Sequence, residues 1–299
     1  MTCSPASRLH IICDWLDVTF APDDCPYPEL NLLLLGAGFA VSRDQGGAKC
    51  YLPPSGYRGM IQIVHASRYA KVSISGGACA ALRDLRLFEQ VLWVLHSSPH
   101  KVTRLDAALD LSMDAADVIA ALVTRYPDGR VNLGRKALPV TRLTSTRPDG
   151  RESGTYYVGH RTAARFTARV YDKSLEALDK RGEVLPTATT RFEVTARKDS
   201  GATLRDAGLP EAIFWHIAAP ALLKRPEGIP VWSPNTDAAW AAPARVFDPA
   251  ETLRRRVEGS AELDALLAVA DAMGGSGRSY LLHLLSRRVQ DVEPFVDVA

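Results

Sequence analysis

The chain of 299 residues lacks the features that mark several common protein classes. No stretch approaches the roughly 18 uninterrupted apolar residues of a membrane span, so no membrane association is expected. The apolar segment 30–40 contains Asn31 and follows no basic region, which argues against a signal peptide. The five cysteines are odd in number and form no CxxC pair, so we expect neither a disulfide framework nor a zinc site, and a cytoplasmic location.

Motifs that bind nucleotide cofactors are absent as well. There is no GxxxxGK[ST] phosphate-binding loop, and the paired glycines do not follow the spacing of a dinucleotide fingerprint. The composition is that of an ordinary globular protein, with 46% hydrophobic and 23% charged residues. This length and composition predict one or two domains with a substantial apolar core.

Positive charge is concentrated in one part of the chain. Residues 135–198 contain 14 Lys and Arg against seven Asp and Glu, a net charge of +7. Because the whole chain carries only +2, the remainder carries −5. Such a concentration is typical of a surface that binds a polyanion, although a solvated basic face without a partner is the alternative.

Strand and helix patterns alternate through the first third of the chain. Their periodicity and capping residues predict strands over residues 11–20, 59–65, 69–75 and 102–111, and helices over residues 28–35, 80–96 and 114–125. The resulting β-α-β-β-α-β order is that of a ferredoxin-like, or split βαβ, unit.

A second and looser group of the same kind follows. Strands are predicted over residues 138–145, 154–158, 165–171 and 189–196, with a short helix over residues 174–181. The sequence therefore predicts an α+β fold with a largely antiparallel sheet, built of two halves over about residues 1–127 and 128–225. Residues 226–299 read as a linker and a helical C-terminal region, with helices over 249–273 and 278–289.

Charged residues interrupt two of the predicted strands in an alternating pattern. Arg104, Asp106 and Asp110 would share one face, while the intervening leucines and alanine face the core. Arg191 and Glu193 likewise share a face of a later strand. Carboxylates in such a setting are costly unless they are paired or bind a cation. Both interpretations stay open: arginine pairs that cross-link strands, or a metal site.

Strand geometry limits which acids can share one ion. Residues four apart on a strand lie roughly 13 Å from each other, so Asp106 and Asp110 cannot both ligate it directly. We favour Asp106 together with Glu193 from a neighbouring strand, with Asp110 in a supporting or structural position. Oxygen ligands without a Cys or His cluster predict Mg²⁺ or Mn²⁺.

Five segments, taken in order and spacing, resemble the replication initiation factor family (Rep_trans), which comprises rolling-circle replication initiators of plasmids and filamentous phages and related conjugative relaxases. They are DWLDVTF at 14–20, TRLDAALD at 103–110, GTYYVG at 154–159, RVYDK at 169–173 and RFEV at 191–194. The resemblance spans residues 11–196. It implies that residues 1–225 form a nicking domain in which a tyrosine cleaves one DNA strand.

The resemblance also implies the roles of individual residues. The nucleophile of the family lies in a Thr-x-Tyr-x-Gly motif, which Tyr157 matches; Tyr156, which would point to the opposite face, is the alternative. The acidic cation site of the family maps onto Asp106 and Glu193. The chain has His160 where the family usually has Ser, which leaves the neighbouring phosphate contact open.

The implied chemistry is physically reasonable. A phenol with a pKa near 10 is a poor nucleophile at neutral pH and needs cations or a base nearby. A divalent ion on the phosphate oxygens offsets the charge repulsion and orients the attack. Attack leaves a 5′-phosphotyrosine and a free 3′-hydroxyl, so religation needs no ATP. The candidate phosphate contacts are Arg104, Arg161, Arg165, Arg169, Lys173 and Arg191.

These observations predict a metal-dependent initiator of rolling-circle replication. Its expected partners are origin DNA, as duplex and as extruded single strand, together with a host helicase and a second copy of the chain. A conjugative relaxase would use the same chemistry. A DNA-binding regulator that kept the fold without catalysis, and an α+β protein unrelated to DNA, are alternatives of other classes.

Overall fold

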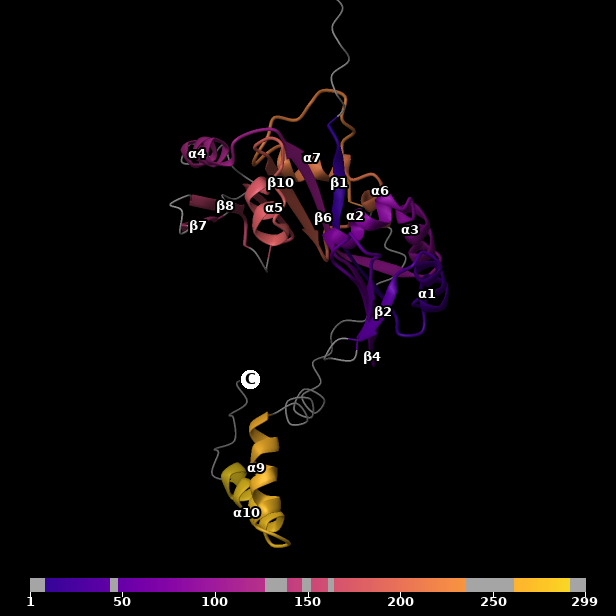
Figure 1. Cartoon of the computed structure of the whole chain (residues 1–299), viewed down its shortest axis with the longest axis vertical. Coiled ribbons are helices and arrows are strands. Elements are labelled where there is room, and N and C mark those ends of the chain that lie inside the picture. Colours follow the sequence, from indigo (N-terminus) through magenta and orange to yellow (C-terminus); the bar gives the residue numbers. More distant parts are fainter. Residues whose placement is uncertain are drawn as a thin grey trace, which may run out of the picture. The chain divides into compact units, whose positions relative to one another are not determined.

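The computed structural model describes residues 9–43, 48–126, 139–146, 152–160, 164–234 and 261–290. The chain forms two compact units, Met1–Ala242 and Pro243–Ala299 (Figure 1). Within the described ranges, the first unit is built on one large sheet and the second on two helices. No helix in these ranges is both long enough and apolar enough to cross a membrane.

Ten antiparallel strands form the sheet of the first unit, in the order β2-β3-β4-β5-β1-β6-β10-β9-β8-β7. Their bounds are β1 (Ile11–Phe20), β2 (Ala40–Arg43), β3 (Lys49–Leu52), β4 (Ile61–Ala66), β5 (Tyr69–Ile74), β6 (His100–Leu111), β7 (Val140–Thr146), β8 (Glu152–Val158), β9 (Phe166–Asp172) and β10 (Thr190–Arg197). The predicted α+β class and the antiparallel sheet are confirmed.

The first half of the sheet has the split βαβ arrangement. Strand β1 is followed by helix α1 (Tyr27–Gly36), the β4-β5 hairpin and β6, and these strands lie in the order β4-β5-β1-β6. Every neighbouring pair is antiparallel. The β2-β3 hairpin, which the sequence patterns did not reveal, extends this half at its outer edge.

The predicted single helix over residues 80–96 is wrong, because two helices occupy this segment. Helix α2 (Gly76–Asp84) and helix α3 (Phe88–His96) are separated at Arg86, whose φ of 59° lies in the left-handed region. The Leu87 amide closes the turn by donating to the Leu82 carbonyl at 2.7 Å. The apolar stripe continues through the break, so periodicity alone does not show it.

The second half of the sheet begins with helix α4 (Ala115–Arg125), which Asp114 caps by accepting from the amides of Ala116 and Asp117. Strands β7, β8 and β9 form a meander. Helix α5 (Lys173–Arg181) ends at Gly182, whose φ is 66°. The chain then returns as β10, which lies between β6 and β9, so β6 and β10 are the central strands that join the two halves.

The two faces of the sheet differ in character. On one face Leu105, Ala107 and Leu109 of β6 are each 1% exposed, as the alternation predicted, and join the apolar core. Helices α2, α4, α6 (Leu204–Gly208) and α7 (Glu211–Ala218) contact the strands of the first unit. The opposite face of the central strands carries charged and hydroxyl side chains, and it holds the candidate site.

The second unit contains helices α9 (Ala261–Ala272) and α10 (Gly277–Gln290). Asp271 and Arg278 form an exposed ion pair at 2.5 Å across their connection. Both helices lie where the sequence predicted a helical C-terminal region. The part of the predicted helix over 249–273 that precedes residue 261 lies outside the described residues.

Candidate functional site

The strand register brings the predicted site residues onto one face of the sheet. Tyr157 of β8 lies opposite Arg169 of β9, which in turn lies opposite Glu193 of β10. Asp106 of β6 lies opposite Thr195 of β10, two residues along from Glu193 and on the same face. Tyr157 and Glu193 are therefore two strands apart, about 10 Å between backbones.

The two adjacent tyrosines point to opposite faces, as expected for a strand. Tyr156 is 0% exposed and belongs to the apolar core. Tyr157 is half-buried and lines cavities on the polar face. Only Tyr157 is therefore accessible to a DNA strand, which supports its choice over Tyr156 without testing its role.

Tyr157 forms part of a basic cleft of about 450 Å³, which we call the cationic cleft. Its lining consists of Arg104, Tyr157, Thr167, Ala168, Arg169, Thr195 and Arg197. Three arginines line it, and no carboxylate does among the described residues. The sequence analysis did not single out Arg197, although its alternation with Arg191 and Glu193 places it on the same face.

Asp106 is buried, with 1% exposure, beside this cleft. Arg104 holds it in a bidentate pair, with Nε donating to Oδ1 at 3.0 Å and Nη2 to Oδ2 at 2.5 Å. The Arg104 guanidinium also lies over the Trp15 ring, 4.5 Å from its centroid. The pair is thus shielded from water on one side, which strengthens it.

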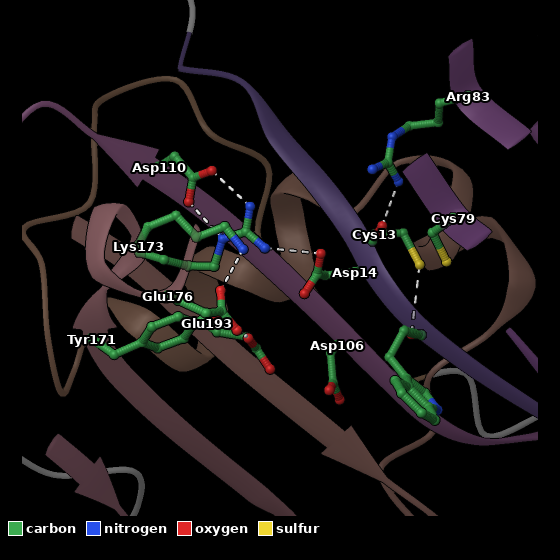
Figure 2. A network of polar contacts seen from close by, with 12 residues as sticks. Cys13, Asp14, Cys79, Arg83, Asp106, Asp110, Tyr171, Lys173, Glu176 and Glu193 are labelled. Atoms are coloured by element: carbon green, nitrogen blue, oxygen red, sulfur yellow. Dashed lines mark hydrogen bonds and ion pairs between the residues drawn. The ribbon is translucent and has the colours of Figure 1, made fainter. Parts of the chain in front are cut away.

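Glu193 is buried to the same degree, at 1% exposure. Arg169 donates to its Oε1, and the Tyr171 hydroxyl donates to its Oε2 at 3.4 Å. Burial raises the pKa of Glu193 from 4.5 to about 7; Arg169 opposes this, while the negative charges of Asp106 and Asp14 add to it. Figure 2 shows Asp14, Asp106 and Glu193 on neighbouring strands. The site therefore concentrates negative charge.

A further ion-paired arginine, Arg191, lies nearer one end of β10. Arg191, which is 6% exposed, donates to both oxygens of Asp110 at 2.6 and 2.7 Å and to Asp14 at 2.9 Å. It thereby cross-links β1, β6 and β10, which agrees with the alternative in which arginine–carboxylate pairs join the strands. Asp14 lies at a register shift between Cys13 and Trp15, so simple alternation along the strand did not reveal it.

The other predicted phosphate contacts that the structure describes are not among the residues that line the cationic cleft. Arg165 donates to the Ser200 carbonyl at 2.7 Å, and its guanidinium lies over the Phe166 ring. Lys173 begins helix α5 and pairs with Glu176 at 2.6 Å. Arg161 lies outside the described residues. Of the five predicted contacts that the structure describes, Arg104 and Arg169 line the cleft.

Asp106 and Glu193 are the predicted ligands of a divalent cation. Among the described residues, no group of three or more His, Cys, Asp or Glu is arranged to hold a metal ion. Two buried carboxylates, Asp106 and Glu193, nevertheless come from adjacent strands, and Mg²⁺ is commonly held by one or two carboxylates plus substrate phosphates. Burial is the main cause of the raised pKa of Glu193, and the negative charges of Asp106 and Asp14 add to it; a bound cation would offset these charges. The two carboxylates would need further oxygens, such as those of a substrate phosphate, to complete the shell of Mg²⁺ or Mn²⁺, and the metal stays a prediction from the sequence.

Comparison with known proteins assigns neither a family nor a function to this chain. No protein-family model matches the chain, and no curated protein matches it. One solved structure that does match is a rolling circle replication initiator protein from Geobacillus stearothermophilus, with 17% identity and a TM-score of 0.48, over 79% of this chain and 93% of that chain. A likeness of this size assigns no function. The resemblance to the replication initiation factor family therefore stays a prediction from the sequence.

Proposed function

We propose that this protein initiates rolling-circle replication by cutting and rejoining one DNA strand at an origin, with Tyr157 as the nucleophile. The observation that carries the proposal is the position of Tyr157. It is half-buried in the wall of a cleft lined by three arginines, two strands from the buried carboxylate of Glu193. A phenol, three guanidinium groups and acidic oxygens thus lie on one face of the sheet, with Tyr157 and Glu193 about 10 Å apart at the backbone.

In the proposed reaction, the Tyr157 hydroxyl oxygen loses its proton and attacks the phosphorus of a phosphodiester. The bond from phosphorus to the 3′-oxygen breaks, and that oxygen takes up a proton. The products are a 5′-phosphotyrosine and a 3′-hydroxyl. Since one phosphoester replaces another, the reverse reaction rejoins the strand without an energy source.

The arginines of the cleft have a clear part in this reaction. Arg169 lies opposite Tyr157, and Arg104 and Arg197 line the same cleft. Guanidinium groups bind phosphate oxygens in bidentate fashion and offset the charge that repels a phenolate. A divalent cation held by Asp106 and Glu193 would stabilise the negative charge that develops on the phosphate oxygens.

One observation supports a second candidate, a DNA-binding regulator without catalysis. Asp106 and Glu193 are each paired with an arginine, so both acids already have partners in the absence of a cation. In a regulator these pairs would be purely structural, and the cleft would bind the DNA backbone alone. A conjugative relaxase would share the chemistry of the initiator and differ only in the DNA that it cuts.

The direct test is to incubate the full chain with Mn²⁺ and a panel of single-stranded oligonucleotides. We expect a protein–DNA conjugate that survives denaturant, with mass spectrometry placing the modification on Tyr157. Tyr157→Phe should lose the conjugate and keep duplex binding. A regulator would form no conjugate with either protein, and an α+β protein unrelated to DNA would show no salt-sensitive DNA affinity.

A further inference from the structure

A second cavity lies on the other side of Tyr157, against helix α5, and we call it the α5 cavity. Its volume is about 360 Å³. Tyr157 and Arg169 line both this cavity and the cationic cleft, so these two side chains separate the two spaces. A DNA strand whose phosphate lies in the cleft would therefore have its neighbouring groups at the mouth of the α5 cavity.

The two spaces differ in charge. Three arginines line the cationic cleft. The α5 cavity is lined by the acids Asp172, Glu176 and Asp179 against the basic residues Arg169 and Lys180. A phosphate is attracted to the first space and repelled by carboxylates in the second. The α5 cavity suits a neutral group that donates hydrogen bonds.

The walls of the α5 cavity suit a flat ring. Leu143 and the buried Leu175 supply apolar surface, and the rings of Tyr157 and Tyr171 supply aromatic surface. Bases of single-stranded DNA stack on such side chains in many proteins. The volume lies at the small end of the roughly 300–1,000 Å³ of ligand pockets, which fits one base rather than a longer segment.

The carboxylates of this cavity all have contacts within the protein. Glu176 accepts from both Lys173 and Lys180, at 2.6 and 2.7 Å. Asp172 caps α5 by accepting from the Leu175 amide at 2.8 Å. Asp179 lies on the same helix and is exposed. A carboxylate has about four lone-pair positions, so Asp179 can accept from a ligand in addition to its contacts within the protein.

We propose that the α5 cavity binds the nucleobase next to the phosphate that Tyr157 attacks, and that Asp179 accepts a hydrogen bond from its exocyclic amino group. This inference rests on the proposed function and deepens it. Cytosine presents an amino group at the position where thymine presents a carbonyl oxygen. The cavity therefore favours cytosine over thymine, since a thymine oxygen would face a carboxylate.

The test measures binding, so it does not depend on cleavage. The full chain carrying Tyr157→Phe, which keeps the aromatic wall, is titrated by fluorescence anisotropy against oligo-dC, oligo-dT and oligo-dU of roughly 12 nucleotides at one fixed salt concentration. We expect oligo-dC to bind about tenfold more tightly than the other two. Oligo-dU controls for the thymine methyl group.

A matched pair of variants assigns the effect to the cavity. Adding Asp179→Asn should abolish the preference for oligo-dC. Adding Asp117→Asn, which removes one exposed carboxylate from α4, should keep it. Equal affinity for oligo-dC and oligo-dT, or a preference that survives Asp179→Asn, would overturn the inference even where the Tyr157 conjugate forms. Absence of the conjugate in the Mn²⁺ experiment counts instead against the proposed function.

Discussion

Strand β8 places two tyrosines in adjacent positions and gives them opposite surroundings. The Tyr156 ring is fully buried, burial raises the pKa of its hydroxyl, and that hydroxyl has no hydrogen-bond partner within the described part of the chain. Tyr157 lies between two cavities, beside Arg169. The same side chain is thus a core residue on one face and a candidate nucleophile on the other.

The comparison extends to the whole second half of the sheet. On the helix-covered face of β10, Phe192, Val194 and Ala196 pack in the core. On the other face the same strand carries Arg191 and Glu193, which are buried and ion-paired. Burial is therefore similar on both faces, and charge pairing is what differs. Substitutions on the polar face should affect chemistry and pH dependence, while those on the apolar face should affect packing.

The largest expected effect is the difference in DNA-conjugate formation between variants of the two tyrosines. Tyr157→Phe should lower formation of the DNA conjugate by about 10³-fold or more, because the attacking oxygen is removed. Tyr156→Phe should leave conjugate formation within about twofold, because its hydroxyl faces the core. Denaturing gels with a labelled oligonucleotide measure both. Equal losses in the two variants would contradict the assignment of the faces to separate roles.

The next largest effect is on stability and concerns the ion pairs that Arg191 makes with Asp110 and Asp14. Arg191→Met leaves Asp110 and Asp14 without their shared partner, which should lower the free energy of unfolding by about 1–3 kcal/mol, because water screens the charge of the exposed Asp110. Arg197→Met, from the cationic cleft, is the matched control. It should lower the free energy of unfolding by less than Arg191→Met does. It should also reduce, by about one unit, the slope of the logarithm of the DNA-binding constant against the logarithm of the salt concentration. Urea denaturation and salt titration distinguish the two.

The protonation of Glu193 should make the free energy of unfolding depend on pH, an effect of intermediate size. Its folded pKa of about 7 lies above its ordinary value of 4.5, so the folded state binds a proton more tightly than the unfolded state between these values. The free energy of unfolding should therefore fall as pH rises from about 4.5 to 7, by on the order of 1–3 kcal/mol.

Glu193→Gln removes the titrating group and should flatten this part of the stability profile. Urea unfolding of both proteins across pH 4.5 to 7.5 provides the measurement. Asp106→Asn offers a comparison at the neighbouring acid. An unchanged slope in Glu193→Gln would show that other groups dominate the titration.

The smallest effect should come from Tyr156→Phe. Removing a buried hydroxyl that has no hydrogen-bond partner among the described residues removes a desolvation cost and leaves no cavity. The melting temperature should therefore stay the same or rise slightly, corresponding to less than about 1 kcal/mol. A clear loss of stability would indicate that the hydroxyl is hydrogen-bonded in solution.

The sequence predicted the strands and their faces well, because alternation of apolar and polar residues is a local signal. Strand β6 and the burial of Leu105, Ala107 and Leu109 illustrate this. Local signals failed where the backbone departs from regular geometry. The break at Arg86 lies within a continuous apolar stripe, and the register shift at Asp14 displaces one side chain from the alternation.

The candidate site could be predicted only in part. The motifs identified Tyr157, Asp106 and Glu193, and the strand register brings them onto one face. The pairing of each acid with a particular arginine depends on which strands are neighbours, and strand order is not encoded locally. The α5 cavity was missed for the same reason, since it depends on segments that meet only in the folded chain. Arg197 could have been found from its alternation with Arg191 and Glu193 along one strand.

The central position of β6 has a mechanical consequence. Because β6 is hydrogen-bonded to β1 on one side and β10 on the other, the two halves form one continuous ladder. Hinging one half against the other would break many of these bonds at once, so the platform that carries the site is stiff. In the proposed reaction the deformation must come from the substrate, and supercoiled DNA with an extruded single strand should be cut far more readily than relaxed duplex.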